Sequence, residues 1–240
     1  DNNNNGQGWN NVLHHLPYGA DTGYPSLFRH FLSETHPPMA DYGAGAASTT
    51  LWVEEAAFPA SFSRTLLSAD WALNEVYRHD VSPAGGTFEV TQEAVMEIPR
   101  PIDLEVSPEQ ELFVASLSGG SYEYAGEHVG YILRLVPEGS TVPPAVTSLE
   151  EAGLVASLLG DSHARRWAAQ RELLARGIPP AAQRRIAVAL DDPELPVEAR
   201  VTAIFTLGEA LGDDAHSILL RLGKDDDPRL REAALRTLAD

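Results

Sequence analysis

Cysteine is absent from the 240 residues of this chain, and lysine occurs only once, at Lys224. The missing thiols exclude disulfide bonds, iron–sulfur ligation, cysteine nucleophiles and covalent haem attachment within these residues. Basic residues are scarce, 17 against 35 acidic ones, so the chain carries a formal net charge of −18. We therefore expect neither a nucleic-acid partner, whose phosphates require basic residues, nor binding to an anionic membrane surface.

Long apolar runs and targeting signals are missing as well. No stretch of 18 apolar residues is present, so we expect no membrane-spanning segment. The sequence opens without Met or a signal-peptide pattern, on Asp1 followed by a run of asparagines. We expect an internal fragment of a longer protein, whose first residues carry no information about its compartment.

The composition changes near Pro143 and Pro144. Residues 1–146 hold 5 basic and 19 acidic residues and most of the aromatic side chains, whereas residues 147–240 hold 12 and 16 and are rich in Ala, Leu and Arg. Three prolines in residues 136–144 cannot donate backbone hydrogen bonds and favour an extended linker. We predict a multidomain β plus α protein, with one domain at 1–138, a linker at 139–146 and a second domain at 147–240.

The first domain is predicted to consist of short strands. Ile102, Leu104 and Val106 alternate with polar residues, which is typical of a half-buried strand, and a turn at 107–110 leads to a strand at 112–115. Further apolar segments predict strands near residues 50–53, 65–69, 76–79 and 130–135. A sandwich, a barrel and a propeller all fit this pattern, and periodicity does not choose among them.

The second domain is predicted to be helical. The pattern Arg-x-x-Ala-x-x-x-Leu occurs three times, beginning at Arg166, Arg200 and Arg231. Its positions share one helix face, so its alanines, Ala169, Ala203 and Ala234, are expected where helices approach closely. Intervening helices are expected at 180–190 and 214–222. The three arginines have two interpretations, ion pairs with aspartates of the turns or a ladder that binds an acidic partner.

Three motifs of the first domain resemble those of glucose/sorbosone dehydrogenase-like β-propellers. They are Gly-Ala-Asp-Thr-Gly-Tyr-Pro at 19–25, Arg-Pro-x-Asp-Leu with Ser-Pro and Leu-Phe-Val at 100–114, and Gly-Tyr-Ile-Leu-Arg-Leu at 130–135. The helical pattern resembles HEAT repeats. This order is similar to that of large dehydrogenase-like, haem-binding multidomain proteins of planctomycetes. The resemblance implies the last blades of a β-propeller at 1–138 and a HEAT-repeat solenoid at 147–240.

The same resemblance implies a function. It suggests a secreted or periplasmic oxidoreductase that acts on a sugar or on another alcohol or aldehyde. Its catalytic base would lie upstream of this fragment, and electrons would pass to a cytochrome c module outside these residues. The alternative is a non-catalytic carbohydrate-binding or protein-interaction scaffold, with a protein partner on the helical repeats.

Candidate cofactor residues also follow from the resemblance. It implies pyrroloquinoline quinone, with Arg100 facing the quinone carboxylates. It further implies Ca²⁺, held by oxygen atoms near Gly6, Gln7 and Asn11, a donor type that suits this cation. The alternatives are that Arg100 pairs with Asp103 or another acidic neighbour, and that the first residues form a polar surface loop.

Two further residues are candidates for binding the substrate. Asp70 and Trp71 follow a predicted strand, and the resemblance places such an Asp-Trp pair at a strand end. In this interpretation Asp70 lines a central channel and Trp71 stacks on a sugar face. The alternative for Trp71 is packing between blades.

Overall fold

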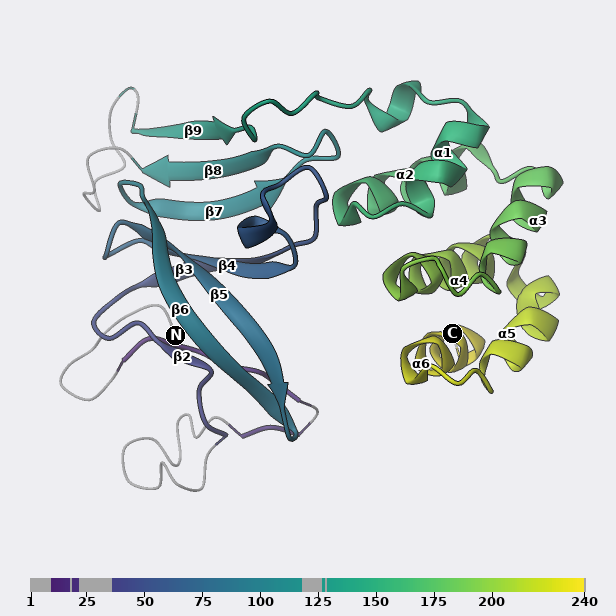
Figure 1. Cartoon of the computed structure of the whole chain (residues 1–240), viewed down its shortest axis with the longest axis horizontal. Helices are drawn as coiled ribbons and strands as arrows, with labels where there is room; N and C mark the ends of the chain where they lie inside the picture. Colours follow the sequence, from purple (N-terminus) through teal and green to yellow (C-terminus); the bar gives the residue numbers. More distant parts are fainter. Residues whose placement is uncertain (1–9, 18, 22–35, 118–126, 128, 240) are drawn as a thin grey trace. The chain divides into compact units, whose positions relative to one another are not determined.

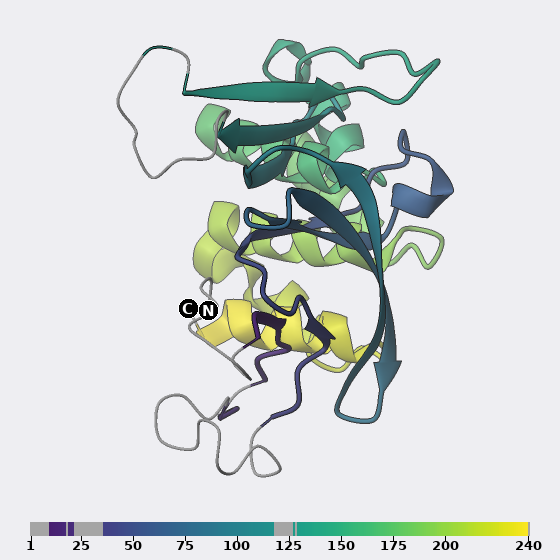
Figure 2. The ribbon, with the colours of Figure 1, turned by 90° about the vertical axis from the view of Figure 1, so that its left-hand side faces the viewer.

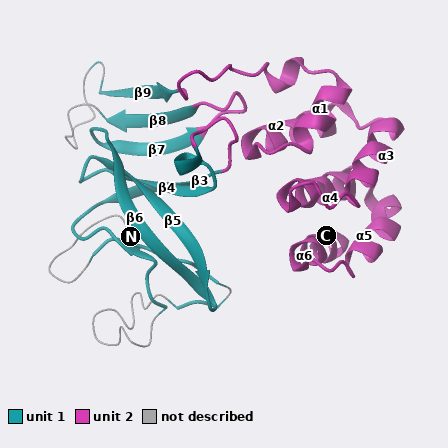
Figure 3. Cartoon of the chain, viewed as in Figure 1, with its two compact units in different colours: residues 1–53, 60–105, 112–135 teal, residues 54–59, 106–111, 136–240 magenta. Residues whose placement is uncertain are grey.

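A computed structural model describes residues 10–17, 19–21, 36–117, 127 and 129–239 of the chain. Strands precede helices along the chain (Figure 1). The residues group into two compact units (Figure 3). The β unit comprises residues 1–53, 60–105 and 112–135, and the helical unit comprises residues 54–59, 106–111 and 136–240. Two short segments that lie early in the chain, 54–59 and 106–111, therefore belong to the helical unit.

The largest sheet of the β unit has four antiparallel strands in chain order. These are β3 (Ala47–Val53), β4 (Thr65–Asp70), β5 (Glu75–Ala84) and β6 (Thr87–Glu97). A short 3₁₀ turn at Ala60–Phe62 precedes β4. Strand β4 is almost entirely buried, although half of its residues, Thr65, Ser68 and Asp70, are polar.

The hairpin formed by β5 and β6 is long and can be followed in both views (Figure 1 and Figure 2). Ala84 pairs with Thr87 across a two-residue connection, Gly85 and Gly86. Gly85 has a φ of 60°, a left-handed conformation that glycine adopts without a steric cost. This Gly-Gly pair therefore sets the tight turn.

Two smaller sheets complete the β unit. One has the order β7 (Pro101–Val106), β8 (Leu112–Leu117) and β9 (Gly130–Leu135), and the other pairs β1 (Val12–Leu13) with β2 (Ala40–Asp41). All six strand segments predicted from the sequence lie in strands. Strands β1, β2 and β6 were not predicted. The first two are only two residues long, whereas β6 does carry a strand signal, the alternation of Phe88 and Val90 with polar residues.

The helical unit contains a 3₁₀ turn at Val146–Ser148 and the helices α1 (Glu151–Leu158), α2 (His163–Arg176), α3 (Pro180–Ala189), α4 (Val197–Leu211), α5 (His216–Leu222) and α6 (Pro228–Ala239). A second 3₁₀ turn, Gly212–Ala215, leads into α5. Ala169, Ala203 and Ala234 are fully buried in one shared hydrophobic core. The prediction that these alanines face neighbouring helices is confirmed.

The family resemblance is wrong. A propeller repeats four-stranded sheets around an axis, whereas the described residues form one four-stranded, one three-stranded and one two-stranded sheet, and they close no ring. The described helices range from 7 to 15 residues around one core and show no repeat solenoid. Of the motifs that suggested the family, Ser-Pro at 107–108 leads into the turn between β7 and β8, and Gly-Tyr-Ile-Leu-Arg-Leu at 130–135 is strand β9. Residues 22–25 of the first motif lie outside the described residues. Short turns and strands of this kind occur in antiparallel sheets of many folds. The coarser prediction of a β plus α protein is confirmed.

Among the helices that the structure describes, none is both long and apolar enough to cross a bilayer.

Candidate functional site

The predicted calcium residues fall in two places. Gly6 and Gln7 lie outside the described residues. Asn11 is buried, and its side-chain amide donates a hydrogen bond to the carbonyl of Gly45. In the described part of the chain no three His, Asp or Glu side chains are grouped so that they could hold a metal. Calcium binding near Asn11 therefore stays a prediction.

Asp70 is buried at the end of β4, where its carboxylate holds the turn into β5. It accepts hydrogen bonds from the backbone amides of Ala72 and Leu73 at 2.9 and 2.8 Å, and from that of Ala46 at 2.9 Å. A short acidic side chain that accepts from amides two and three residues ahead is a common way to fix a turn. Its oxygens thus have backbone partners in this structure.

Arg100 and Trp71 meet at the same turn. The Arg100 guanidinium carbon lies 4.1 Å from the centre of the Trp71 ring, and its Nη1 donates to the Trp71 carbonyl at 3.2 Å. The backbone amide of Arg100 donates to the side chain of Asn74. Arg100 therefore covers one face of the indole by a cation–π contact. The structure brings Arg100, Trp71 and Asp70 together, and their roles toward a quinone or a sugar stay predictions.

Helix α2 in the helical unit organises a different and better-built site. At its first turn, the backbone amide of Arg165 donates to Ser162 Oγ at 3.1 Å and that of Ala164 donates to Glu55 Oε1 at 2.9 Å. The first amides of a helix have no partner within the helix. A serine at the N-cap position and a carboxylate from the 54–59 segment supply two of those partners here.

A buried ion pair lies beside this helix start. Arg166 is 1% exposed, and its guanidinium contacts the Glu54 carboxylate at 3.3 Å and donates to the Gly160 carbonyl at 3.0 Å. Burial raises the pKa of Glu55, which outweighs the opposite influence of its hydrogen bonds and of Arg166. Burial, aided by the positive charge of Arg166, lowers the pKa of His163. The start of α2 is therefore held by a buried ion pair and by two ionisable side chains, Glu55 and His163, whose charged forms burial disfavours.

Two other arginines of α2 hold segments on either side of a pocket. Arg165 donates from Nη1 to the carbonyls of Pro108 and Pro144, at 2.9 and 3.1 Å. Arg176, near the other end of the helix, donates to the carbonyls of Thr147 and Leu149 at 2.7 and 2.8 Å. One helix thus fixes the 106–111 turn and the 144–149 segment through charge-assisted hydrogen bonds.

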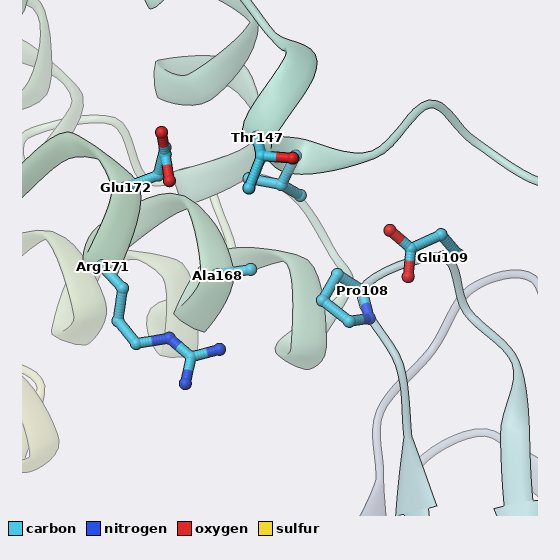
Figure 4. A pocket seen from close by; sticks show the side chains of 7 residues that line it. Pro108, Glu109, Thr147, Ala168, Arg171 and Glu172 are labelled. Carbon is cyan, nitrogen blue, oxygen red and sulfur yellow. The ribbon is translucent and has the colours of Figure 1, made fainter. Parts of the chain in front are cut away.

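The pocket between these segments has a volume of about 260 Å³ and belongs wholly to the helical unit (Figure 4). It is lined by the apolar Pro108, Val146 and Ala168 and by the polar Glu109, Thr147, Arg171 and Glu172. Figure 4 shows the Glu109 carboxylate on the side opposite the α2 residues.

The charges around the pocket are only partly paired. Glu172 is paired with Arg176 at 2.7 Å. Among the described residues, the side chains of Arg171 and Glu109 have no hydrogen bond or ion pair with another group. The pocket therefore offers one free cation and one free anion on a frame that is already ordered.

The sequence did not predict this pocket. Arg165, Arg171 and Arg176 are visible in the sequence as basic residues of one predicted helix, but their partners come from segments up to 57 residues away. A turn residue such as Glu109 carries no signal that it will face a helix so distant in the chain. Compared with models of protein families, with curated proteins and with solved structures, the chain matches none.

Proposed function

We propose that this chain is a non-catalytic binding protein whose α2 pocket takes a small zwitterion, such as a free amino acid. The observation that carries the proposal is that Arg171 and Glu109 line one pocket without a side-chain partner of their own among the described residues. A guanidinium binds a carboxylate through a planar pair of donors, and a carboxylate accepts from an ammonium group.

Charge and size both support a small ligand with no net charge. Arg171 and Glu109 in the lining carry opposite charges, Glu172 is paired with Arg176 of the same helix, and the whole chain at −18 repels multiply charged anions. The volume of about 260 Å³ is below the range of roughly 300–1,000 Å³ that drug-sized ligands occupy. An amino acid with a modest apolar side chain suits the apolar surface of Pro108, Val146 and Ala168.

The sequence left two alternatives, an oxidoreductase and a non-catalytic carbohydrate-binding or protein-interaction scaffold. The present proposal shares with the second alternative only that the protein is non-catalytic. The oxidoreductase hypothesis, with its quinone, its cytochrome partner and its periplasmic location, depended on a family resemblance that is wrong. A carbohydrate ligand is less favoured for this pocket, because its described lining residues include no aromatic ring on which a sugar could stack.

The test is calorimetric titration of the full chain with each of the common amino acids, and with matched amines and carboxylic acids that lack one charged group. We expect saturable binding of at least one amino acid and at least tenfold weaker binding of its singly charged analogues, which corresponds to about 1.4 kcal/mol or more.

Three variants assign that binding to the pocket. Arg171→Gln and Glu109→Gln are each expected to weaken it at least tenfold. Arg184→Gln, an exposed arginine on α3 outside the pocket, is expected to bind like the wild type. Absence of binding across the panel, or equal affinity in all three variants, would contradict the proposal.

A further inference from the structure

A second polar cluster is buried in the β unit. His79 on β5 and Ser68 on β4 are both 0% exposed, and Tyr42, which follows β2, is almost completely buried. The hydroxyl of Tyr42 donates to Ser68 Oγ at 2.8 Å. Ser68 Oγ lies 2.8 Å from His79 Nε2, and the Tyr42 hydroxyl lies 3.2 Å from the same nitrogen. The ring is therefore part of a compact network without contact with water.

This network anchors the segment 40–46, which we name the Tyr42 segment. The Tyr42 ring stacks edge-on against Tyr77 of β5, with 5.5 Å between ring centres. The backbone of the segment is held as well, since the Tyr42 amide donates to the Asn11 carbonyl at 2.8 Å. Its far end is held where the Ala46 amide donates to Asp70 at 2.9 Å. Tyr42 is thus the side chain that fastens this segment to the sheet face.

The second ring nitrogen of His79 is buried and has no partner. Among the described residues, no donor or acceptor lies within hydrogen-bonding distance of Nδ1. A protonated imidazole carries a hydrogen on both nitrogens. The two hydroxyls can accept the hydrogen on Nε2, but the hydrogen on Nδ1 would remain buried without an acceptor, which is costly.

Among the described residues, Asp80 is the carboxylate that favours the charged ring of His79, and burial outweighs it. Asp80 follows it on β5, has a 62% exposed side chain and points to the opposite face, as successive strand residues do. Asp70 on β4 is occupied by backbone amides, and Glu75 on β5 interacts with Tyr77. The residues paired with His79 are Leu66 on β4 and Gln92 on β6, which carry no charge.

We propose that His79 is an acid-sensitive latch: protonation of its ring releases the Tyr42 segment from the sheet while the helical unit stays folded. A proton from water binds the imidazole, and release of the segment lets the ring and the Tyr42 hydroxyl exchange their mutual contacts for water. The uncovered face of β4 and β5 then carries Ser68 and Tyr77. Restoring neutral pH removes the proton and allows the segment to bind again.

Linkage sets the size of the effect. Burial lowers the pKa of His79 from 6.5 to about 4. The open form, with a ring in water, therefore binds protons more readily than the closed form between these two values. With pKa values of 6.5 in the open form and about 4 in the closed form, the fraction of molecules with the Tyr42 segment released rises about 20-fold between pH 7 and pH 5. His14 is also less easily protonated because of burial and of His36, so a variant of His79 itself is needed to assign the effect.

The experiment is hydrogen–deuterium exchange of the full chain at pH 7 and pH 5, with rates corrected for intrinsic pH dependence. We expect the amides of residues 42–46 to lose about 20-fold in protection at pH 5, while those of α2 and α4 do not. In His79→Gln the protection of residues 42–46 should be the same at both pH values. In His216→Gln, an exposed histidine of the helical unit, the loss should match that of the wild type.

Three outcomes would overturn the latch. One is an unchanged pH dependence in His79→Gln, and another is an equal loss in the helical unit, which would indicate global unfolding by acid. If His79→Gln does not fold, the wild type still decides, because NMR titration of the His79 ring must share its midpoint with the exchange of residues 42–46. The third outcome that would overturn the latch is a His79 ring that titrates while the exchange of residues 42–46 does not change.

Discussion

Arg166 is the largest fully buried side chain among the described residues, and its guanidinium pairs with the Glu54 carboxylate and donates to the Gly160 carbonyl. Replacing a buried pair as a whole can be nearly neutral, but removing one partner leaves the other as an uncompensated buried charge. Arg166→Met should therefore lower the free energy of unfolding by about 3–5 kcal/mol, measured by urea denaturation.

A solvent-exposed arginine serves as the control for this variant. Arg236 lies 3.8 Å from Glu232 on α6, and both side chains are 70% exposed. Because exposed pairs contribute little, Arg236→Met should change stability by less than about 1 kcal/mol. Equal effects of the two substitutions would show that burial of Arg166 does not determine its contribution.

Glu55 gives a pH-dependent prediction at the same scale. Its pKa is raised by burial above the value of 4.5 that it has in water, so its stabilising contribution is complete below pH 4.5 and is lost as pH rises through the folded-state pKa. Glu55→Gln keeps the side-chain carbonyl that accepts from Ala164 and removes the charge. Its free energy of unfolding should exceed that of the wild type at pH 7, and the difference should shrink toward pH 4.

Urea denaturation at several pH values tests this prediction. Glu209→Gln, at an exposed position of α4, should not alter the pH dependence of stability. A Glu55→Gln variant that is less stable than the wild type at pH 7 would show that the charge of Glu55 stabilises the start of α2.

At the scale of secondary-structure elements, the close contact of α4 with α6 requires a residue without a side chain, Gly208. A Cβ atom added at Gly208 on α4 would overlap with Cγ2 of Thr237 on α6. Thr237 cannot rotate freely, because its hydroxyl donates to the Ala233 carbonyl at 2.8 Å. Gly208 is therefore required by close helix packing and not by backbone conformation.

Gly208→Ala should destabilise the chain by about 1–3 kcal/mol through overpacking, although alanine in a helix interior normally gains about 1 kcal/mol over glycine. Thr237→Ser removes the overlapping methyl group and keeps the hydroxyl. In that background Gly208→Ala should become neutral or stabilising. A double-mutant cycle by thermal denaturation measures this interaction, and additive effects of the two substitutions would contradict it.

The arginines of the repeated helical pattern also act between elements. Arg166, Arg200 and Arg231 donate to carbonyls of the turns that precede their helices, those of Gly160, of Leu190, and of Asp225 and Asp226. The sequence suggested ion pairs with turn aspartates, and one such pair forms, between Arg200 and Asp225 at 3.6 Å. What the three arginines share is therefore a hydrogen bond to backbone carbonyls near the end of the preceding helix, where these oxygens have no partner within the helix.

At the scale of the whole molecule, the net charge of −18 opposes compactness through self-repulsion. Salt screens this repulsion, since the Debye length falls from about 30 Å at 0.01 M to about 10 Å at 0.1 M. Raising NaCl over this range at pH 7 should therefore raise the midpoint of the first thermal transition. Near pH 4.7, the isoelectric point of the sequence, the same change should have little effect. A midpoint that falls with salt at pH 7 would contradict this expectation.

The sequence predicted the features that depend on local periodicity. Alternation at Ile102, Leu104 and Val106 identified a strand, and the spacing of Ala169, Ala203 and Ala234 identified buried helix faces. The family was wrongly inferred because short motifs such as Ser-Pro at 107–108 and the strand at 130–135 indicate only a turn or a strand, which many folds share. The candidate site was missed because its residues become neighbours only after the chain has folded.

Secondary structure, the buried helix faces and the acidic character of this protein are thus determined by the sequence itself, since each follows from side chains within a few residues of one another or from a sum over the chain. Only the tertiary structure decided which segments meet. Glu55 accepts from the amide of Ala164, 109 residues later, and Tyr42 reaches His79 across 37 residues. Hydrogen-bond donors and acceptors are unselective, so their partners are chosen by the burial of apolar surface that brings distant loops together.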